Sequence, residues 1–456
     1  MRSAYCYNHH NQTFIAVVKN MFRFKAGSRF RNGILTIAIE SMPPVKYTTS
    51  GRKRRTRARV YLRFGLTAGL VITLALTAFT ANTQAAAPNQ SPLPFETAIR
   101  STFNKLIDDV RKDLGNTSGP EEMVIVLDLF SDEDTGEIPR VSQRIQSVML
   151  DEATRRFFEF RVARFTLEES RNADYMIRGS IHLGATETKD IIIYRVSAEV
   201  IDAWNMNTIG TARKWVSDPE LDYNPLALYH DNPFYDPAYF QRKKVKGEVG
   251  NIGSTAHPIY SMETLALLRD ATSAYERRNY QNALALFSDA AARADGQTLL
   301  ILTGLYLTNF RLGRLTEADS TFTRIIDIGV KRYGKITVRF LFRKNSVDFW
   351  EGDVATARYG AWLGRIGEYF YQREDCLRIV GHSSNSGPEP WNEQLSVLRA
   401  EQIQYLLRGS LPGVKKRTLA TGVGSRENVV GIGTDDERDA LDRRVELIPV
   451  VCKELE

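Results

Sequence analysis

The stretch "GHSSNSGPEPWNEQLSVLRA", residues 381–400, decides how the C-terminal part of the chain folds, because it joins a predicted strand to a predicted helix through a loop of small polar residues. Asn392 follows two prolines and is expected to be the N-cap of this helix, whose free backbone N–H groups would favour an anion. Arg399 lies seven residues further on and therefore on the same face. The apolar side chains expected to face inward are Leu395, Leu398, Ile403 and Leu406.

Predicted strands and a second helix surround this stretch. Residues 335–349 begin a strand in which Val338, Phe340 and Phe342 alternate with polar neighbours. A helix follows, and the strand "CLRIVGH", 376–382, then leads into the loop. The stretches "RTLATGVG", 417–424, and "RRVELIPVV", 443–451, supply two more strands. The predicted order is therefore strand, helix, strand, helix, strand, loop, strand.

Four motifs occur in this order: "LRIVGHSSNSG", "NEQLSVLRAEQIQYLL", "TGVG" and "LDRRVEL". Together they resemble the OmpA-like domain, whose motifs read GHTD–x–x–G, N–x–x–LS–x–x–RA, G–x–G and NRRVE. The resemblance implies noncovalent binding of peptidoglycan through the diaminopimelate of its stem peptide. It also implies that the motif's Asp takes the ligand's ammonium and that its Arg grips a carboxylate.

The resemblance carries over to particular residues. The motif's Arg is Arg399, whose planar guanidinium can hold a carboxylate with two parallel hydrogen bonds. The alternative is that Arg399 pairs with a neighbouring acid and simply holds the helix. Of the two arginines in the last motif, one is expected to face the ligand loop and the other solvent, and the Asn before them is Asp442 here. The expected peptidoglycan-binding residues are Arg399, Asn392, Ser384, Asn385, Arg443 and Arg444.

The chain departs from the motif at Ser384, where a neutral hydroxyl replaces the carboxylate. Binding of the ligand's carboxylate by Arg399 is expected to be kept, whereas binding of its ammonium at Ser384 is expected to be weaker. Three alternatives stay open: binding is looser and depends on Arg399, another acid such as Glu389 substitutes, or the domain recognises a stem peptide that lacks the ammonium.

The N-terminal region is strongly basic. Residues 1–63 carry 14 Lys and Arg and one acid, Glu40, although the whole chain has a net charge of +7, so the rest is mildly acidic and shows no nucleic-acid footprint. The basic run 52–63 leads into residues 64–81, which carry no charge. This pattern predicts an export signal, cleaved after Ala85 or Ala86 or else kept as a membrane anchor. Met42 is a candidate start, which makes the beginning of the sequence doubtful.

Cysteine usage fits an exported protein. Cys6 lies in the doubtful leader, which leaves Cys376 and Cys452 in an oxidising compartment. They form either a disulfide or a pair of buried small hydrophobes, because a sequence does not supply the distance. No Cys follows the apolar stretch, so lipid attachment at that point is excluded.

Two further blocks precede the C-terminal one. The first combines the apolar strand "VIVLDL", 124–129, with helices and with the strand 190–203, whose alternation predicts one wet face. Its pattern weakly resembles the periplasmic domain of lipoprotein activators of penicillin-binding proteins and of the curli-secretion channel family. In the second block, the spacing of Tyr280, Ala283, Phe287 and Ala290 recurs 35 positions later as Leu315, Ala318, Phe322 and Ile325. This repeat resembles two tetratricopeptide units.

We therefore expect an α+β multidomain protein. Its expected parts are a doubtful extension (1–51), a signal peptide or transmembrane anchor (52–86), an α/β periplasmic domain (93–220), an irregular linker (221–261), helical repeats (262–332) and the OmpA-like domain (333–452). The tyrosines of the long linker could stack on a ligand, but the linker is rather expected to pack its aromatic side chains over a neighbouring domain.

Binding is the expected activity, and catalysis is not. His382 beside Ser383 and Ser384 lacks the strand–Ser–helix elbow of a nucleophile, and the histidines show no metal-ligand spacing, so no cofactor or metal is expected. Two hypotheses remain for a protein of the periplasm or cell envelope of a Gram-negative-type bacterium. It is either an anchor that grips the stem peptide of peptidoglycan, or an adaptor that binds an envelope protein through its repeats while its wall domain is degenerate.

Overall fold

The computed structural model contains two compact units, residues 1–81 and 82–456. It describes residues 30–31, 34–35, 91–115, 123–184, 193–234, 260–340, 342–349, 358–373, 375–429 and 441–455. In the first unit, β1 (Phe30–Arg31) and β2 (Ile34–Leu35) pair antiparallel. The predicted leader, 52–86, lies outside the described residues. Within the described ranges, no helix is both long and apolar enough to cross a membrane.

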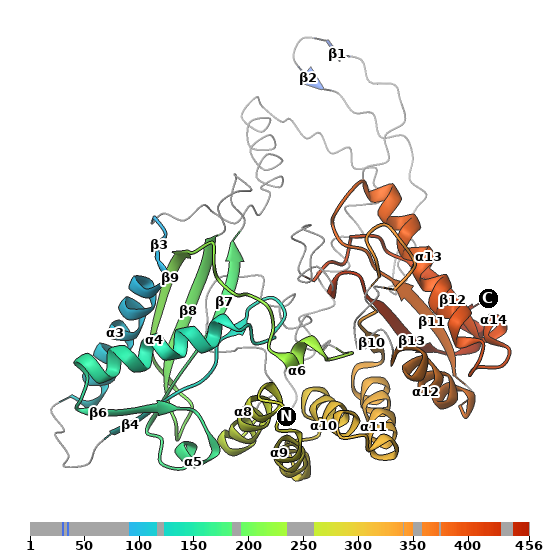
Figure 1. The fold of residues 1–456 in the computed structure, drawn as a ribbon. Helices are drawn as coiled ribbons and strands as arrows, with labels where there is room; N and C mark the ends of the chain where they lie inside the picture. The colour runs from blue at the N-terminus through green and yellow to red at the C-terminus, as the bar shows by residue number, and fades with distance from the viewer. Residues whose placement is uncertain are drawn as a thin grey trace, which may run out of the picture. The chain divides into compact units, whose positions relative to one another are not determined.

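A seven-stranded mixed sheet forms the first part of the second unit (Figure 1). Its strands run in the order β3-β9-β8-β7-β4-β6, with β5 beside β7. The strands are β3 (Leu93–Pro94), β4 (Met123–Leu127), β5 (Ser131–Asp132), β6 (Phe160–Arg164), β7 (Tyr175–Gly184), β8 (Ile193–Asp202) and β9 (Thr208–Ser217). The helices are α3 (Phe95–Leu114), α4 (Val141–Arg156) and the short α5 (Leu167–Ser170).

One face of this sheet packs against α3 and α4. Buried Phe103 of α3 and Ile145 of α4 share an apolar cluster with Val196 of β8. The opposite face of β8 was expected to be wet, and this prediction is wrong at Glu199, which is fully buried. Arg178 of the neighbouring strand donates to Glu199 at 2.7 Å, so a cross-strand charge pair makes this burial tolerable.

Part of the predicted irregular linker is ordered by packing. It contains the helix α6 (Ala227–His230), and its Leu228 and Tyr229 are buried. Tyr223 stacks on Tyr194 of β8 with ring centroids 5.2 Å apart. These aromatic side chains therefore pack over neighbouring elements, as expected, while residues 235–259 lie outside the described part.

Four helices follow: α8 (Met262–Glu276), α9 (Tyr280–Ala292), α10 (Leu299–Arg311) and α11 (Leu315–Tyr333). The 35-residue spacing predicted from the sequence relates the first residues of α9 and α11. Phe287 of α9 and its counterpart Phe322 of α11 are buried. A Cβ atom at Gly304 of α10 would lie 2.3 Å from the ring of Phe287, so the glycine lets these two helices approach closely.

The C-terminal part has the predicted order of elements. Its sheet runs β10-β13-β11-β12, and β11 pairs parallel with β12 and antiparallel with β13. The strands are β10 (Ile336–Val338), β11 (Cys376–Gly381), β12 (Thr418–Gly422) and β13 (Val445–Val450). The helices are α12 (Tyr359–Tyr371), α13 (Glu389–Leu407), the short α14 (Val414–Arg417) and the 3-10 helix η3 (Cys452–Leu455).

The apolar core runs without a break from the helices α8–α11 into this four-stranded sheet. The same cluster includes Val126 of β4, on the face of the first sheet opposite α3. Arg269 of α8 is buried and donates to both carboxylate oxygens of Asp128, at 2.6 and 2.9 Å. The domain boundaries near residues 220 and 333 stay predictions. Buried side chains from both sides of each boundary belong to one apolar cluster.

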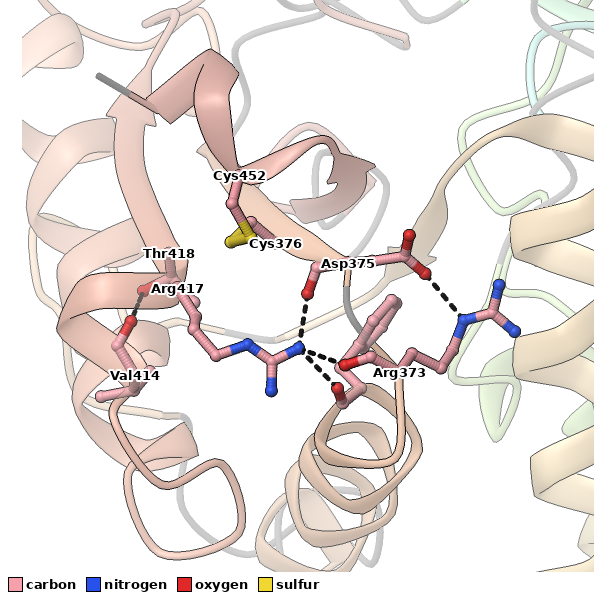
Figure 2. Close-up of a disulfide and its surroundings, with 8 residues drawn as sticks. Arg373, Asp375, Cys376, Val414, Arg417, Thr418 and Cys452 are labelled. Carbon is pink, nitrogen blue, oxygen red and sulfur yellow. Dashed lines mark hydrogen bonds and ion pairs between the residues drawn. A yellow bond between two sulfur atoms is a disulfide. The ribbon is translucent and has the colours of Figure 1, made fainter.

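A disulfide joins Cys376 to Cys452, whose Cα atoms lie 4.9 Å apart (Figure 2). The strands explain the meeting, because Cys376 opposes Val450 in the antiparallel ladder of β11 and β13. Beside it, the Arg417 guanidinium donates to the backbone carbonyls of Phe370, Arg373 and Asp375 at 2.8, 2.6 and 2.6 Å. Of the two alternatives for these cysteines, the structure has the disulfide.

Candidate functional site

Four segments meet at one end of the four-stranded sheet. Gly381 at the end of β11 is level with Gly422 at the end of β12, because these strands run parallel. Gly381 also pairs with Val445 at the start of antiparallel β13, and Val445 pairs with Val338 at the end of β10. The segments after β10, β11 and β12, and the segment before β13, therefore gather at this end. They carry the residues that the sequence singled out.

The helix α13 packs closely on this end of the sheet because three positions are small. A Cβ at Gly381 would lie 1.9 Å from the carbonyl oxygen of Ser396, and one at Gly422 would lie 2.2 Å from the Ser396 hydroxyl. That hydroxyl accepts from the backbone N–H of Gly424 at 2.9 Å and donates to the carbonyl of Glu393 at 2.7 Å. The glycines and the Ser of the motifs thus position the helix that carries Arg399.

The prediction that Asn392 caps this helix is wrong. The helix α13 begins one turn earlier, at Glu389, with Pro388 as its N-cap residue and Pro390 in its first turn. Proline is tolerated there because its missing N–H would have had no partner within the helix. The N–H groups of Trp391 and Asn392 donate to the Pro388 carbonyl at 3.0 and 3.1 Å. The anion site expected from free N–H groups at Asn392 is therefore not supported.

Asn392 nevertheless lies in the site region as a buried residue of α13, and its amide donates to the Gly387 carbonyl at 3.4 Å. The predicted inward-facing set is right for Leu395 and Ile403, which are buried. It is wrong for Leu398, which is 39% exposed, whereas Leu406 is partly buried and packs against the core beside the buried Leu407. The predicted inward-facing set therefore fails only at Leu398, near the middle of the helix.

Arg399 lies on the buried face of α13, with 1% of its surface exposed. Its Nε donates to the Ser346 carbonyl and its Nη2 to the Arg343 carbonyl, each at 3.2 Å. The guanidinium carbon also lies 5.0 Å from the centroid of the Phe342 ring. The segment after β10 therefore covers Arg399 with neutral main-chain acceptors and an aromatic face. Sequence patterns did not indicate this segment, because its contacts with Arg399 span more than fifty positions.

The loop after β11 holds Ser384 and Asn385. Ser384 is buried, with its hydroxyl 3.2 Å from that of Ser386, whereas Asn385 is exposed. The backbone N–H of His382 donates to the Arg444 carbonyl and that of Ser383 to the Gly424 carbonyl, both at 3.0 Å. The loop is thus tied to two of the other segments, and its buried polar group is a hydroxyl where the motif has a carboxylate.

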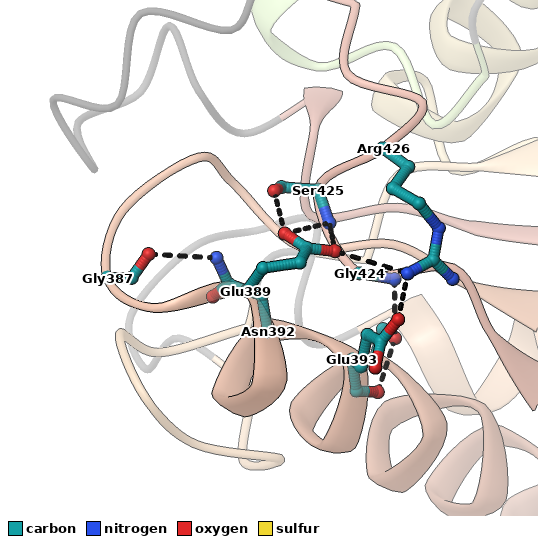
Figure 3. A network of polar contacts seen from close by, with 8 residues as sticks. Gly387, Glu389, Asn392, Glu393, Gly424, Ser425 and Arg426 are labelled. Carbon is teal, nitrogen blue, oxygen red and sulfur yellow. Dashed lines mark hydrogen bonds and ion pairs between the residues drawn. The ribbon is translucent and has the colours of Figure 1, made fainter. Parts of the chain in front are cut away.

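The carboxylate of Glu389 accepts hydrogen bonds from the segment after β12 (Figure 3). It accepts from the backbone N–H and the hydroxyl of Ser425 and lies 3.5 Å from a guanidinium nitrogen of Arg426. Gly424 has a φ of +59°, and a Cβ there would lie 2.1 Å from Glu389 Oε1. Because Glu389 already joins α13 to this segment, the geometry does not favour it as a replacement for the missing Asp.

Arg443 and Arg444 are both buried, so the prediction that one of them faces solvent is wrong. They precede β13, and strand alternation therefore does not apply to them. Arg444 donates to Glu446 at 3.0 Å and to the Glu427 carbonyl at 3.1 Å. Burial opposes ionisation of Glu446, but Arg444 and other nearby cations outweigh it and hold the pKa of this carboxyl well below its usual value.

The described residues offer little for a metal ion. In the parts of the chain that the structure describes, no three His, Cys, Asp or Glu side chains form a group that could hold one. The arrangement presents a buried guanidinium, hydroxyls and amides on converging loops. These groups suit noncovalent recognition of an anionic ligand.

No family model matches the chain, and no curated protein matches it. Among solved structures, it is similar to the peptidoglycan-associated lipoprotein from Burkholderia pseudomallei, with 21% identity over 24% of this chain and 88% of that chain and a TM-score of 0.21. It is also similar to the cell wall anchor of the T6SS from Pseudomonas aeruginosa (22% identity, 28% and 96% covered, TM-score 0.22). A third is the OmpA-like domain of FopA1 from Francisella tularensis (13% identity, 25% and 70% covered, TM-score 0.20). These likenesses span about a quarter of the chain at low TM-scores.

Proposed function

We propose that this protein binds peptidoglycan noncovalently at the end of its four-stranded sheet and so positions its preceding parts in the cell envelope. The observation that carries the proposal is Arg399, a buried arginine held against two main-chain carbonyls where four segments meet. The motif resemblance of the same residues supports it, as does the disulfide, which suits an oxidising compartment.

A carboxylate of the stem peptide is the ligand group that suits Arg399. Hydrogen bonds to a charged acceptor are roughly twice as strong as bonds to a neutral carbonyl, and the guanidinium fork matches a carboxylate in shape. Because Arg399 is 1% exposed, the ligand has to displace residues 343–346 to reach it. The carbonyls of Arg343 and Ser346 would then be exchanged for the carboxylate oxygens.

Ser384 sets how the other end of the ligand is held. Its hydroxyl gives an ammonium a neutral acceptor, so we propose looser binding that depends on Arg399, or a stem peptide that lacks the ammonium. Glu389 is the weaker candidate, since Ser425 and Arg426 hold its carboxylate. We propose a binding protein and not an enzyme.

Cosedimentation with purified insoluble peptidoglycan tests the proposal. The full chain is expected to pellet with the wall, and Arg399→Ala is expected to weaken this by about tenfold to a hundredfold, because a charge-assisted hydrogen bond is lost. Arg378→Ala is the matched control, since Arg378 is an exposed arginine of β11 in the same sheet. Equal pelleting of Arg399→Ala and the control would refute a wall site at Arg399.

A groove favours a second candidate function, binding of an envelope protein. A cavity of about 520 Å³ lies against α9, α10 and α11, and its lining includes Leu284, Leu305, Asn309 and Arg314. A tetratricopeptide-like repeat that holds a partner segment there would make the protein an adaptor, with a degenerate wall domain at Ser384. Failure of the wild-type chain to pellet, with retained binding of a defined envelope partner, would favour this candidate.

A further inference from the structure

The outer face of α13 carries a row of exposed apolar side chains. Trp391, Leu398 and Tyr405 are 42%, 39% and 51% exposed, and the guanidinium carbon of Arg408 lies over the Tyr405 ring, 3.4 Å from its centroid. They are spaced seven residues apart, so neighbours in the row are about 10.5 Å apart along the helix axis. Burial of the opposite face of α13, with Leu395, Ala400 and Ile403 in the core, keeps this row pointing outward.

The row begins at the candidate site. The indole N–H of Trp391 donates to the side chain of Asn345 at 3.4 Å. Asn345 lies between Arg343 and Ser346, whose carbonyls accept from Arg399. A ligand that displaces this segment to reach Arg399 therefore lies at the N-terminal end of the row.

A coiled-coil contact with a second copy fits the row poorly. Seven-residue spacing supplies only half of a coiled-coil seam, and the other half has to be apolar as well. The positions that would complete it are Gln394, Glu401 and Arg408, all polar and exposed. Three half-exposed side chains also cover far less surface than the roughly 800 Å² per partner of a stable interface.

We propose that the row Trp391, Leu398 and Tyr405 is a platform for the glycan strand of peptidoglycan, an inference that rests on the proposed function. Pyranose rings have apolar C–H faces that pack on aromatic and aliphatic side chains, and hydroxyl edges that need polar partners. Gln394 and Glu401 offer such partners beside the row. Two turns of helix are close in length to a β-1,4-linked disaccharide, so successive side chains of the row meet equivalent rings of the strand. The stem peptide that branches from the strand would then reach Arg399.

Two probes separate this inference from the proposed function. One is glycan strands freed of stem peptides by an amidase, and the other is a soluble stem peptide without sugar. In the full chain, Tyr405→Ala and Leu398→Ala are each expected to weaken glycan binding by roughly threefold to tenfold, the size of a lost ring contact. Both variants should bind the stem peptide as the wild type does. Tyr371→Ala is the matched control, because Tyr371 is 59% exposed at the end of α12, off the row.

Each outcome decides one point. Glycan binding that is equal in Tyr405→Ala, Leu398→Ala and the control overturns the platform. Stem-peptide binding without any glycan binding by the wild type overturns it too, and leaves the proposed function standing. Binding of neither probe removes the proposed function and the platform with it. A wild-type dimer that dissociates in Leu398→Ala, measured by light scattering, overturns the platform in favour of a second copy.

Discussion

Arg399 at the four-stranded sheet donates to acceptors of another kind than Arg269 and Arg178 at the seven-stranded sheet. Beside the seven-stranded sheet, Arg269 and Arg178 donate to the carboxylates of Asp128 and Glu199 at 2.6 and 2.7 Å. At the end of the four-stranded sheet, Arg399 donates to two main-chain carbonyls. A carboxylate partner neutralises a buried cation, whereas a carbonyl only satisfies its N–H groups. In the first arrangement, ion pairs join a helix or a neighbouring strand to the sheet, and in the second, hydrogen bonds join α13 to the segment after β10.

Two buried carboxyls, Asp132 at the seven-stranded sheet and Glu446 at the four-stranded sheet, have pKa values shifted in opposite directions. Burial and the neighbouring Asp134 raise the pKa of Asp132, beside β7, to about 6. Glu446, on β13, has its pKa lowered, because Arg444, His382 and Lys335 outweigh its burial. In the four-stranded sheet, the buried Glu446 is therefore surrounded by cations that favour its charged form.

The largest expected effect on the free energy of unfolding comes from breaking the buried ion pair of Arg269 with Asp128. Arg269→Met leaves the Asp128 carboxylate buried without its guanidinium, and removing one partner of a buried pair costs about 3–5 kcal/mol of unfolding free energy. Urea unfolding measures this loss. Arg365→Ala is the control, because the half-exposed pair of Arg365 with Asp319 is worth at most about 1 kcal/mol. Losses of unfolding free energy of similar size in Arg269→Met and Arg365→Ala would contradict the expectation that the buried pair contributes more than the exposed one.

The disulfide is expected to come next in size. Cys452→Ser removes a bridge that spans 76 positions, and loss of the cross-link is expected to lower the free energy of unfolding by about 2–4 kcal/mol in the chain-entropy model. A reductant should destabilise the wild type by the same amount and leave Cys452→Ser unchanged. If the reductant lowers both equally, its effect does not come from this bridge.

The opposite pKa shifts predict opposite responses to pH. Folded Asp132 keeps a proton up to a pKa of about 6, whereas the unfolded chain loses it near 3.9. The stability of the wild type should therefore fall as pH rises from about 4 to about 6, by on the order of 2 kcal/mol. Asp132→Asn removes this fall. Urea unfolding should therefore show that the substitution changes the free energy of unfolding more favourably, relative to the wild type, at pH 7 than at pH 4.

Glu446 provides the contrasting variant. Because its folded pKa is lowered, its stabilising effect is present above its unfolded pKa, near 4.3, and is lost as the pH falls towards the folded value. Glu446→Gln should therefore be destabilising at pH 7 and less so in acid. The same sign of pH response in Asp132→Asn and Glu446→Gln would contradict the comparison of the two sheets.

The smallest expected effect is a gain at Ser384. Ser384→Asp places an anion where the motif has one, so affinity for a stem peptide that carries the diaminopimelate ammonium should rise several-fold. The gain should shrink with added salt, since a partly exposed pair is screened. Weaker binding of Ser384→Asp in the same titration would mean that the ligand presents no cation there, and would point to an amidated or otherwise modified stem.

The sequence predicted the C-terminal sheet well because its motif residues serve packing. Gly381, Gly422 and Ser396 let α13 lie close to the strands, so their spacing follows from the fold itself. The meeting of Cys376 with Cys452 needed the ladder of β11 and β13, which the sequence left open. Apolar periodicity likewise gave the helices α9 and α11 with their buried Phe residues.

The predictions failed where a local sequence pattern is compatible with more than one structure, or where a contact between distant residues decides the outcome. The helix α13 starts at Glu389 rather than Asn392, because a proline fits its first turn. Glu199 is buried despite the alternation of its strand, because Arg178 on the next strand neutralises it. The segment over Arg399 was missed, because a bond from a side chain to a distant main-chain carbonyl leaves no pattern in the sequence.

The central claim is that Arg399 is the anion-binding group of a wall site, and direct titration tests it. A soluble stem peptide that carries diaminopimelate is titrated into the full chain and into Arg399→Ala and Arg399→Lys, after thermal unfolding has shown that the variants fold. The account predicts a loss of affinity of about tenfold to a hundredfold for Arg399→Ala, and a partial loss for Arg399→Lys, which keeps the charge without the fork. Equal affinities of the wild type and Arg399→Ala would contradict it.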